Sequence, residues 1–218
     1  MSEKLANFIS LIFHPLLIPT YIFGVLFYLA PEVIANLQSY QSANSQAIIK
    51  IGFKENLLFL LFLCTFLMPA SIIYYLHKIK IVPSLKMEEL STRRIPYFFT
   101  FLIYLFFGFF IKYKLPLLDE IALAIFSISA CLFSIYIISL FWKISAHLTG
   151  IGGAIGLFIA IYLKKGADSL FLPILISIIL AGLIASARLK LNAHNNAQIV
   201  AGFTLGFVIS VISIIIYL

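Results

Sequence analysis

Apolar residues dominate the chain in long runs, and short polar stretches separate them. Seven runs lie at approximately 8 to 30, 56 to 77, 96 to 112, 121 to 142, 149 to 163, 169 to 186 and 197 to 218. A helix needs about 20 apolar residues to cross the hydrocarbon core of a bilayer. The pattern therefore predicts an all-α fold, a polytopic transmembrane helical bundle of six to seven spans.

Two of these runs differ from the others. The run after Thr149 is short for a full crossing, and the run at 8 to 30 contains Pro15 and Pro19. Proline removes a backbone donor and interrupts a regular helix, so we expect either segment to tilt, break or re-enter. The count is seven spans, with six as the alternative. Residues 31 to 54 form the only sizeable predicted loop.

Composition supports a single membrane domain over residues 1 to 218. Hydrophobic residues make up 63% of the chain and charged residues 11%, whereas about a quarter of the residues in soluble domains are charged. We therefore expect an integral, multi-pass protein of a bacterial inner membrane, with the bilayer and not nucleic acid as its partner. Cys64 and Cys131 lie in the middle of apolar runs, where they are expected to be small packing residues.

Polar residues concentrate in three stretches, at 86 to 96, 143 to 147 and 187 to 198. An ionisable side chain at membrane depth costs several kcal/mol unless it is paired or lines a wet cavity, so it indicates a functional site. Two predicted spans separate each stretch from the next, which brings all three to the same membrane face. We therefore expect them to form one site.

The residue types in these stretches are those of an anion receptor. The candidates are Lys86, Arg93 and Arg94, then Ser145 and His147, then Arg188, His194 and Gln198. Cations that converge with two histidines and few carboxylates bind a multiply charged anion such as phosphate. Histidine beside a bound phosphate can attack phosphorus or protonate a leaving oxygen.

Helix termini add to this receptor. Asn195 and Asn196 are good N-cap types before the last span, and Thr149 could cap the span that follows His147. Both histidines would then lie at helix N-termini, where free N–H groups favour an anion. If the cations that would hold the anion are set aside, the remaining basic residues are equal on the two faces, so charge gives no orientation for the site.

The spacing of the third stretch resembles a known signature. Arg188, five residues, His194, three residues and Gln198, followed by Ala201-Gly202, is similar to the third signature of the type 2 phosphatidic acid phosphatase superfamily. That signature reads Ser-Arg, five residues, His, three residues, Asp.

Two further stretches resemble the other signatures of this superfamily, in the right order. Ile144-Ser145-Ala146-His147 resembles the second, Pro-Ser-Gly-His, and Lys86, six residues and Arg93 resembles the first, Lys, six residues, Arg-Pro. The resemblance spans residues 86 to 202. A phosphatase-like core would then cover about 80 to 218, after N-terminal spans at about 8 to 77 that carry no signature.

The resemblance implies a metal-independent lipid phosphatase without a cofactor, which hydrolyses a lipid phosphate or a polyprenyl diphosphate. His194 would attack phosphorus to give a phosphohistidine, His147 would protonate the departing oxygen, and Gln198 would accept a hydrogen bond from the nucleophilic ring. The phosphoryl oxygens would be held by Lys86, Arg93 or its neighbour Arg94, Arg188, and backbone N–H groups around Ser145.

The chain departs from the family pattern at several positions. Gln198 replaces Asp, so its amide oxygen can fix the tautomer of His194 but cannot stabilise positive charge on the ring. Dolichyl diphosphatases of the same superfamily also resemble His, three residues, Gln, which favours an active enzyme. Two predicted spans separate the first two signatures, where the family has a short loop, so residues 86 to 96 are alternatively an ordinary basic stretch beside the membrane.

Other functions remain open at this stage. Gln198 and Ala187, which replaces Ser, favour a catalytically inactive relative that binds or transports phospholipid. Broken helices are mild support for a transporter. A magnesium-dependent phosphotransferase would need paired carboxylates, and only eight acidic residues are present. His14 is interpreted as structural or near the headgroups, and His77 as interfacial. The spacings Gly152-xxx-Gly156 and Gly202-xxx-Gly206 indicate close helix packing.

Overall fold

Helices are the only regular secondary structure in the residues that the computed structural model of the protein describes, which are 1–37, 52–85, 87 and 89–217. No strand occurs among them, so the predicted all-α fold is confirmed. Residues 38–51 of the predicted loop lie outside this described part. Six described helices are long and apolar enough to cross a membrane, as expected for a multi-pass membrane protein. They are Phe53–Lys78, Ser91–Lys114, Asp119–Ile138, Ala146–Lys165, Asp168–Lys190 and Asn196–Tyr217.

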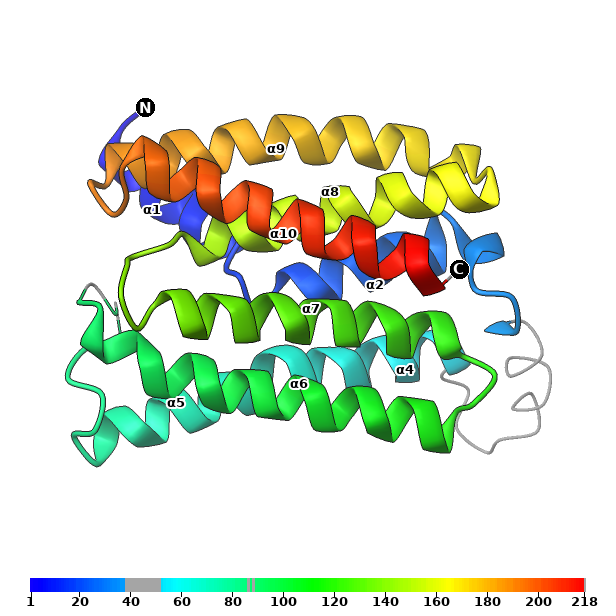
Figure 1. Ribbon diagram of the computed structural model, residues 1–218, viewed down its shortest axis with the longest axis horizontal. Helices are drawn as coiled ribbons and strands as arrows, with labels where there is room; N and C mark the ends of the chain where they lie inside the picture. The colour runs from blue at the N-terminus through cyan, green and yellow to red at the C-terminus, as the bar shows by residue number, and fades with distance from the viewer. Residues whose placement is uncertain (38–51, 86, 88, 218) are drawn as a thin grey trace.

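These spans contain the elements labelled in Figure 1. The first consists of α4 (Phe53–Phe62), a π-helical turn η3 (Leu63–Leu67) and α5 (Met68–Lys78). The next four contain η4 (Ser91–Arg93) with α6 (Arg94–Lys114), α7 (Asp119–Ile138), α8 (Ala146–Lys165), and η5 (Asp168–Leu170) with α9 (Phe171–Lys190). The last is α10 (Asn196–Tyr217).

The predicted span at 8 to 30 is wrong as one continuous helix. It forms two short helices, α1 (Glu3–Ile12) and α2 (Ile18–Tyr28), and only α2 is a shorter apolar helix by composition. The expected break is present at residues 13 to 17, where Pro15 cannot donate to the helical ladder. The short run after Thr149 also differs from prediction, because α8 begins at Ala146 and has 20 residues, enough to span about 30 Å.

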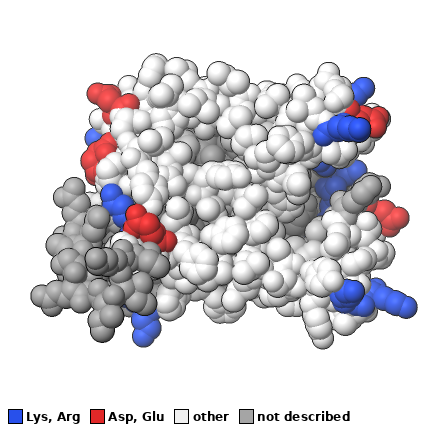
Figure 2. Space-filling view, turned by 180° about the vertical axis from the view of Figure 1, so that it is seen from behind, with Lys and Arg blue, Asp and Glu red and all other residues white. Residues whose placement is uncertain are grey.

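On the face of the molecule drawn in Figure 2, charged residues lie at the two ends. Figure 2 shows Lys, Arg, Asp and Glu at both ends and an uncharged band between them. Large apolar side chains are exposed along this band, among them Phe106, Ile179 and Val200. Lipid tails are as apolar as these side chains, so the exposed band fits the hydrocarbon core of a bilayer.

Helix α8 lies at the centre of the bundle. It contacts α10, α9, α7 and α2, and 61% of its apolar window is buried, against at most 50% for the other five spans. In Figure 1, α9 and α10 lie with α8 on one side, while α6 packs on α7 on the other. The short helix α1 packs on α9.

Glycines bring α8 and α10 into close backbone contact, as predicted. A Cβ on Gly152 would lie 2.3 Å from the carbonyl oxygen of Phe203, and one on Gly206 would lie 2.0 Å from that of Thr149. Neither position has room for a larger residue. The two helices that carry the second and third sequence stretches are therefore held at a fixed, short separation.

The π-helical turn in the Phe53–Lys78 span has a local cause. Pro69 has no N–H, so it cannot donate to the carbonyl of Thr65 four residues earlier. The hydroxyl of Tyr104 donates to that carbonyl instead, at 2.6 Å. Tyr104 is fully buried, and this bond ties the middle of α6 to the middle of the neighbouring span.

The three polar stretches lie at one end of the bundle. The N-terminus, the end of α5, the start of α6, the α7–α8 connection and the α9–α10 connection all lie at the left of Figure 1. The prediction that the stretches share one face is therefore confirmed. Counting the broken α1–α2 segment as a passage from this end to the other gives the same parity as seven spans.

Candidate functional site

Side chains from all three polar stretches line a single cavity near this end of the bundle. It has a volume of about 150 Å³ and includes Arg93, His147, Arg188 and His194 in its lining. These residues come from the start of α6, the start of α8, the end of α9 and the loop before α10. Four of the eight residues proposed from sequence are therefore brought together.

Gln198 holds His194 through the start of α10. The side-chain oxygen of Asn195 accepts from the N–H of Gln198 at 3.0 Å, and the amide oxygen of Gln198 accepts from the N–H of Asn195 at 3.3 Å. This reciprocal arrangement is a capping box, in which Asn195 is the N-cap. The predicted cap at this position is confirmed.

The same amide oxygen of Gln198 lies 3.0 Å from Nδ1 of His194. Because that oxygen is an acceptor and already faces a backbone N–H, Nδ1 must carry the proton that is shared with it. The lone pair of the neutral ring is then on Nε2. Gln198 thus fixes the tautomer of His194 through the contact that the family resemblance implied.

His194 is buried, with 8% of its surface exposed. Burial lowers its pKa to about 4, the hydrogen bond to Gln198 opposes this shift, and the positive charges of Arg93, Arg188 and Lys143 lower the pKa further. At neutral pH the ring is therefore uncharged and its Nε2 lone pair is available.

His147 is held by a residue that no sequence signature includes. Its Nε2 lies 3.1 Å from the backbone carbonyl oxygen of Ser10 in α1. A carbonyl can only accept, so Nε2 donates, and the lone pair of the neutral ring is then on Nδ1. Ser10 orients His147 as Gln198 orients His194.

Arg188 also contacts Ser10. Its Nη1 donates to the hydroxyl of Ser10 at 3.2 Å. Its Nε is buried and has no hydrogen-bond partner within the part of the chain that the structure describes. A buried N–H without an acceptor is costly, and an anion in the cavity would satisfy it.

Arg93 is buried, with 5% of its surface exposed. Its Nε donates to the carbonyl of Met87 at 2.7 Å, and its Nη1 donates to the carbonyl of Ile144 at 3.3 Å. Arg93 thereby joins the loop before α6 to the loop before α8. The stretch at 86 to 96 is next to the site although two spans separate it from the second stretch along the chain.

Arg94 does not belong to the cavity. Its side chain is exposed and donates to the carbonyl of Leu140 at 3.0 Å. Of the two neighbouring arginines that the sequence offered as alternatives, only Arg93 lines the cavity. Lys86 lies outside the described residues, so its predicted part in phosphate binding stays a prediction.

Ser145 acts on the backbone and does not line the cavity. Its hydroxyl caps α8 by accepting from the N–H of Leu148 at 3.5 Å, and its own N–H donates to the carbonyl of Gln198 at 3.3 Å. The prediction that Thr149 caps this helix is wrong, because α8 begins at Ala146. Ala146 lines the cavity.

His14 is the residue whose place the sequence interpretation did not anticipate. It lines the cavity, and its ring centroid lies 6.0 Å from that of His147 in an edge-to-face arrangement. The signal was an imidazole next to Pro15 inside an apolar run. His77 lies outside the cavity lining and interacts with the carbonyl of Val82 at 2.8 Å.

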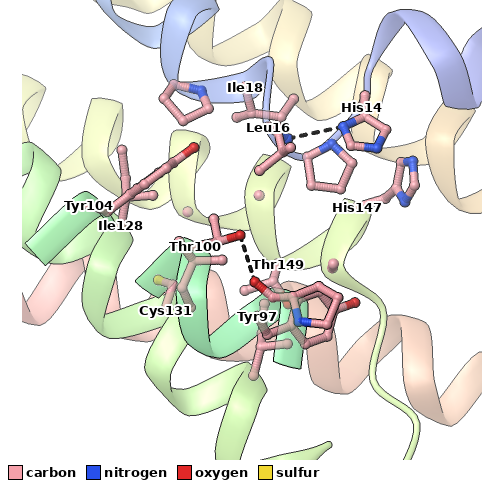
Figure 3. Close-up of a pocket in the computed structure, with 18 of the residues that line it drawn as sticks. His14, Leu16, Ile18, Tyr97, Thr100, Tyr104, Ile128, Cys131, His147 and Thr149 are labelled. Carbon is pink, nitrogen blue, oxygen red and sulfur yellow. Dashed lines mark hydrogen bonds between the residues drawn. The ribbon is translucent and has the colours of Figure 1, made fainter. Parts of the chain in front are cut away.

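The cavity has a polar end and an apolar end. Figure 3 shows His14 and His147 side by side on one part of its wall and Tyr104 and Ile128 on another. Arg93 and Tyr104 both line the cavity. They are 11 residues apart along the α6 span, which corresponds to a rise of about 16 Å along the helix. An amphiphile with an anionic head and an apolar tail matches this gradient.

No carboxylate lines the cavity among the described residues. The one salt bridge between described side chains joins Lys165 to Glu120 at the other end of the bundle. The described residues contain no group of three or more His, Cys, Asp and Glu placed to hold a metal ion. Arg93 and Arg188 therefore give the cavity a positive charge that no described carboxylate neutralises.

Comparisons with known proteins return no match to any family model, curated protein or solved structure.

Proposed function

We propose that the protein is a membrane lipid phosphatase that hydrolyses a lipid phosphate or diphosphate through a phosphohistidine on His194. The observation that carries this proposal is the convergence of Arg93, His147, Arg188 and His194 on one cavity. Two guanidinium groups without a carboxylate favour a multiply charged anion. Nε2 of His194 can attack phosphorus because Nδ1 faces Gln198. Nδ1 of His147 can carry the proton for the leaving oxygen because Nε2 faces Ser10.

In the first step, the lone pair on Nε2 of His194 attacks phosphorus. The bond between phosphorus and the leaving oxygen breaks, and that oxygen takes the Nδ1 proton that His147 carries once the phosphate anion is bound. The positive charge of His147 is shared with the carbonyl of Ser10, which accepts from Nε2 at 3.1 Å. A lipid alcohol or a lipid monophosphate departs, and a phosphohistidine remains.

In the second step, water attacks the phosphohistidine. His147, now neutral, accepts a proton from the water on Nδ1, the phosphorus–nitrogen bond breaks, and its electron pair returns to Nε2 of His194. Inorganic phosphate is released and both rings regain their starting states. Arg93 and Arg188 match the charge on the phosphoryl oxygens in both transition states.

Two further observations support a lipid as the substrate. The cavity extends from charged residues near the end of the bundle that carries the three polar stretches to Tyr104 and Ile128 within the bundle. The buried Nε of Arg188 has no acceptor in the described part of the chain, and a phosphoryl oxygen would provide one. A phosphate head near the bilayer surface with a tail directed inward fits both features.

The test is release of inorganic phosphate by purified, detergent-solubilised protein in EDTA. Phosphatidic acid, phosphatidylglycerol phosphate and a polyprenyl diphosphate are supplied separately. His194→Ala is expected to abolish release, and His147→Ala to reduce it by about 10² to 10⁴-fold, the usual contribution of general acid–base catalysis. His77→Ala is the matched control, because His77 lies at the same end outside the cavity.

Brief incubation with lipid carrying a ³²P-labelled terminal phosphate should also give the wild-type protein an acid-labile label that His194→Ala lacks. Activity that survives in His194→Ala rejects the nucleophile. A wild-type protein that binds these lipids but releases no phosphate from any of them would be the inactive relative that Gln198 left open.

A further inference from the structure

The broken N-terminal segment supplies three groups to the site. Ser10, at the end of α1, contacts His147 through its carbonyl and Arg188 through its hydroxyl. His14, in the break between α1 and α2, contacts the ring of His147. The segment thus forms a wall of the cavity that the three sequence stretches do not provide.

The orientation of His14 is fixed by its own backbone. Its Nδ1 accepts from the N–H of Leu16 at 3.3 Å, as the dashed line in Figure 3 indicates. The proton of the neutral ring is then on Nε2, which is a donor. His14 can therefore bind an oxygen anion without becoming charged.

His147 shares the cavity lining with both other histidines. Its ring centroid lies 6.0 Å from that of His14. In the proposed reaction His194 is bonded to the transferred phosphorus, and His147 faces the leaving oxygen. The second neighbour of His147, His14, then faces the group that departs.

The nature of the departing group follows from this neighbour. If the substrate were a lipid monophosphate, the departing group would be an alkyl alcohol, for which an imidazole N–H is a poor surrounding. If it were a lipid diphosphate, the departing group would be a lipid monophosphate, whose oxygens accept hydrogen bonds from such a donor. Arg188 lines the same cavity as His14 and His194, which suits two adjacent phosphates.

We propose that His14 binds the inner phosphate of a lipid diphosphate and that this contact makes diphosphates the preferred substrates of the site. The inference rests on the proposed phosphatase function. Hydrolysis breaks the bond between the outer phosphorus and the bridging oxygen. That oxygen leaves with the inner phosphate and takes its proton from His147.

The experiment compares farnesyl diphosphate with farnesyl monophosphate, which share one tail. For His14→Leu, kcat/KM on the diphosphate is expected to fall about 10- to 100-fold, as for loss of a hydrogen bond to a charged group. Because His14 also contacts the ring of His147, kcat/KM on the monophosphate is expected to fall as well, but by a much smaller factor. His14→Gln keeps an N–H near the position of Nε2 and should recover part of the loss. His77→Leu is the control at the same end of the bundle.

An equal loss on both substrates, or no loss on either, would overturn the proposal while leaving the phosphatase intact. Failure of the proposed phosphohistidine mechanism would be seen separately, as phosphate release that remains in His194→Ala.

A binding measurement tests the same assignment if the protein binds these lipids without hydrolysing them. Inorganic pyrophosphate should raise the melting temperature of the solubilised protein more than orthophosphate does, and His14→Leu should remove that difference. Equal stabilisation of the wild type by the two anions, or a pyrophosphate advantage that survives in His14→Leu, would contradict the assignment.

Discussion

Gly202→Ala offers a test of how helix spacing controls the chemistry. A Cβ on Gly202 would lie 2.6 Å from the carbonyl oxygen of Ser145, whereas ordinary contacts of this kind begin at 3.4 Å. That carbonyl is held by Thr149, whose N–H and hydroxyl both donate to it at 3.0 Å. The oxygen cannot rotate away, so α10 must move from the start of α8 by about 0.8 Å, the difference between the two distances.

The displacement acts where the two imidazoles are positioned. His194 and Gln198 precede Gly202 by two turns and one turn, while His147 follows Ser145 by two residues. A misplacement of about 1 Å can cost about 10²-fold in rate, and overpacking costs about 1 to 3 kcal/mol of stability. We expect kcat/KM for phosphate release to fall about 10²-fold while the protein stays folded.

The assay is phosphate release per mole of monodisperse protein, with the melting temperature measured on the same sample. Gly182→Ala is the matched control, because nothing lies within 4 Å of a Cβ at that position in α9. Equal activity of the Gly202→Ala and Gly182→Ala proteins would show that the spacing of α8 and α10 at this point does not control the chemistry. Gly206→Ala, with a contact of 2.0 Å to the carbonyl of Thr149, should instead lower the melting temperature more strongly.

Two further predictions concern charge. Arg93→Met should lower kcat/KM for phosphate release about 10² to 10³-fold, as for loss of one transition-state donor. Arg94→Met should leave kcat/KM unchanged, because Arg94 is exposed outside the cavity. Equal effects of the two substitutions in phosphate-release assays would contradict the geometry. The lowered pKa of His194, about 4 against 6.5 for a free ring, predicts that its contribution to stability is complete above pH 6.5 and is lost as the pH falls toward 4. In NMR of imidazole-labelled protein without substrate, a ring absent from His194→Ala should titrate near pH 4, and titration near pH 6.5 would show that the ring is not buried as described.

Local chemistry accounts for much of what could be predicted from the chain. Runs of about 20 apolar residues are sufficient for membrane helices because backbone groups must be satisfied within each segment in lipid. The contact between His194 and Gln198 is also local, because residues three or four apart meet at the start of a helix. The capping box of Asn195 and Gln198 is also local.

Contacts between distant segments could not be predicted in this way. Arg93 and Arg94 are adjacent and chemically identical, and only the packing of α6 turns Arg93 into the cavity and Arg94 toward Leu140. Ser145 is a polar residue in a signature-like stretch, yet the start of α8 uses its hydroxyl as a cap. Sequence spacing does not contain this choice, because it depends on which neighbours surround each side chain.

The helical membrane class and the shared end of the three polar stretches followed from the residues of the chain, and the contact of His194 with Gln198 was implied by the family resemblance. The tertiary structure alone decided that Ser10 and His14 join them. Ser10 lies 137 residues from His147 and 178 from Arg188 along the chain. Contacts across such separations arise from the packing of α1 on α9 and of α2 on α8, which no local pattern of residues specifies.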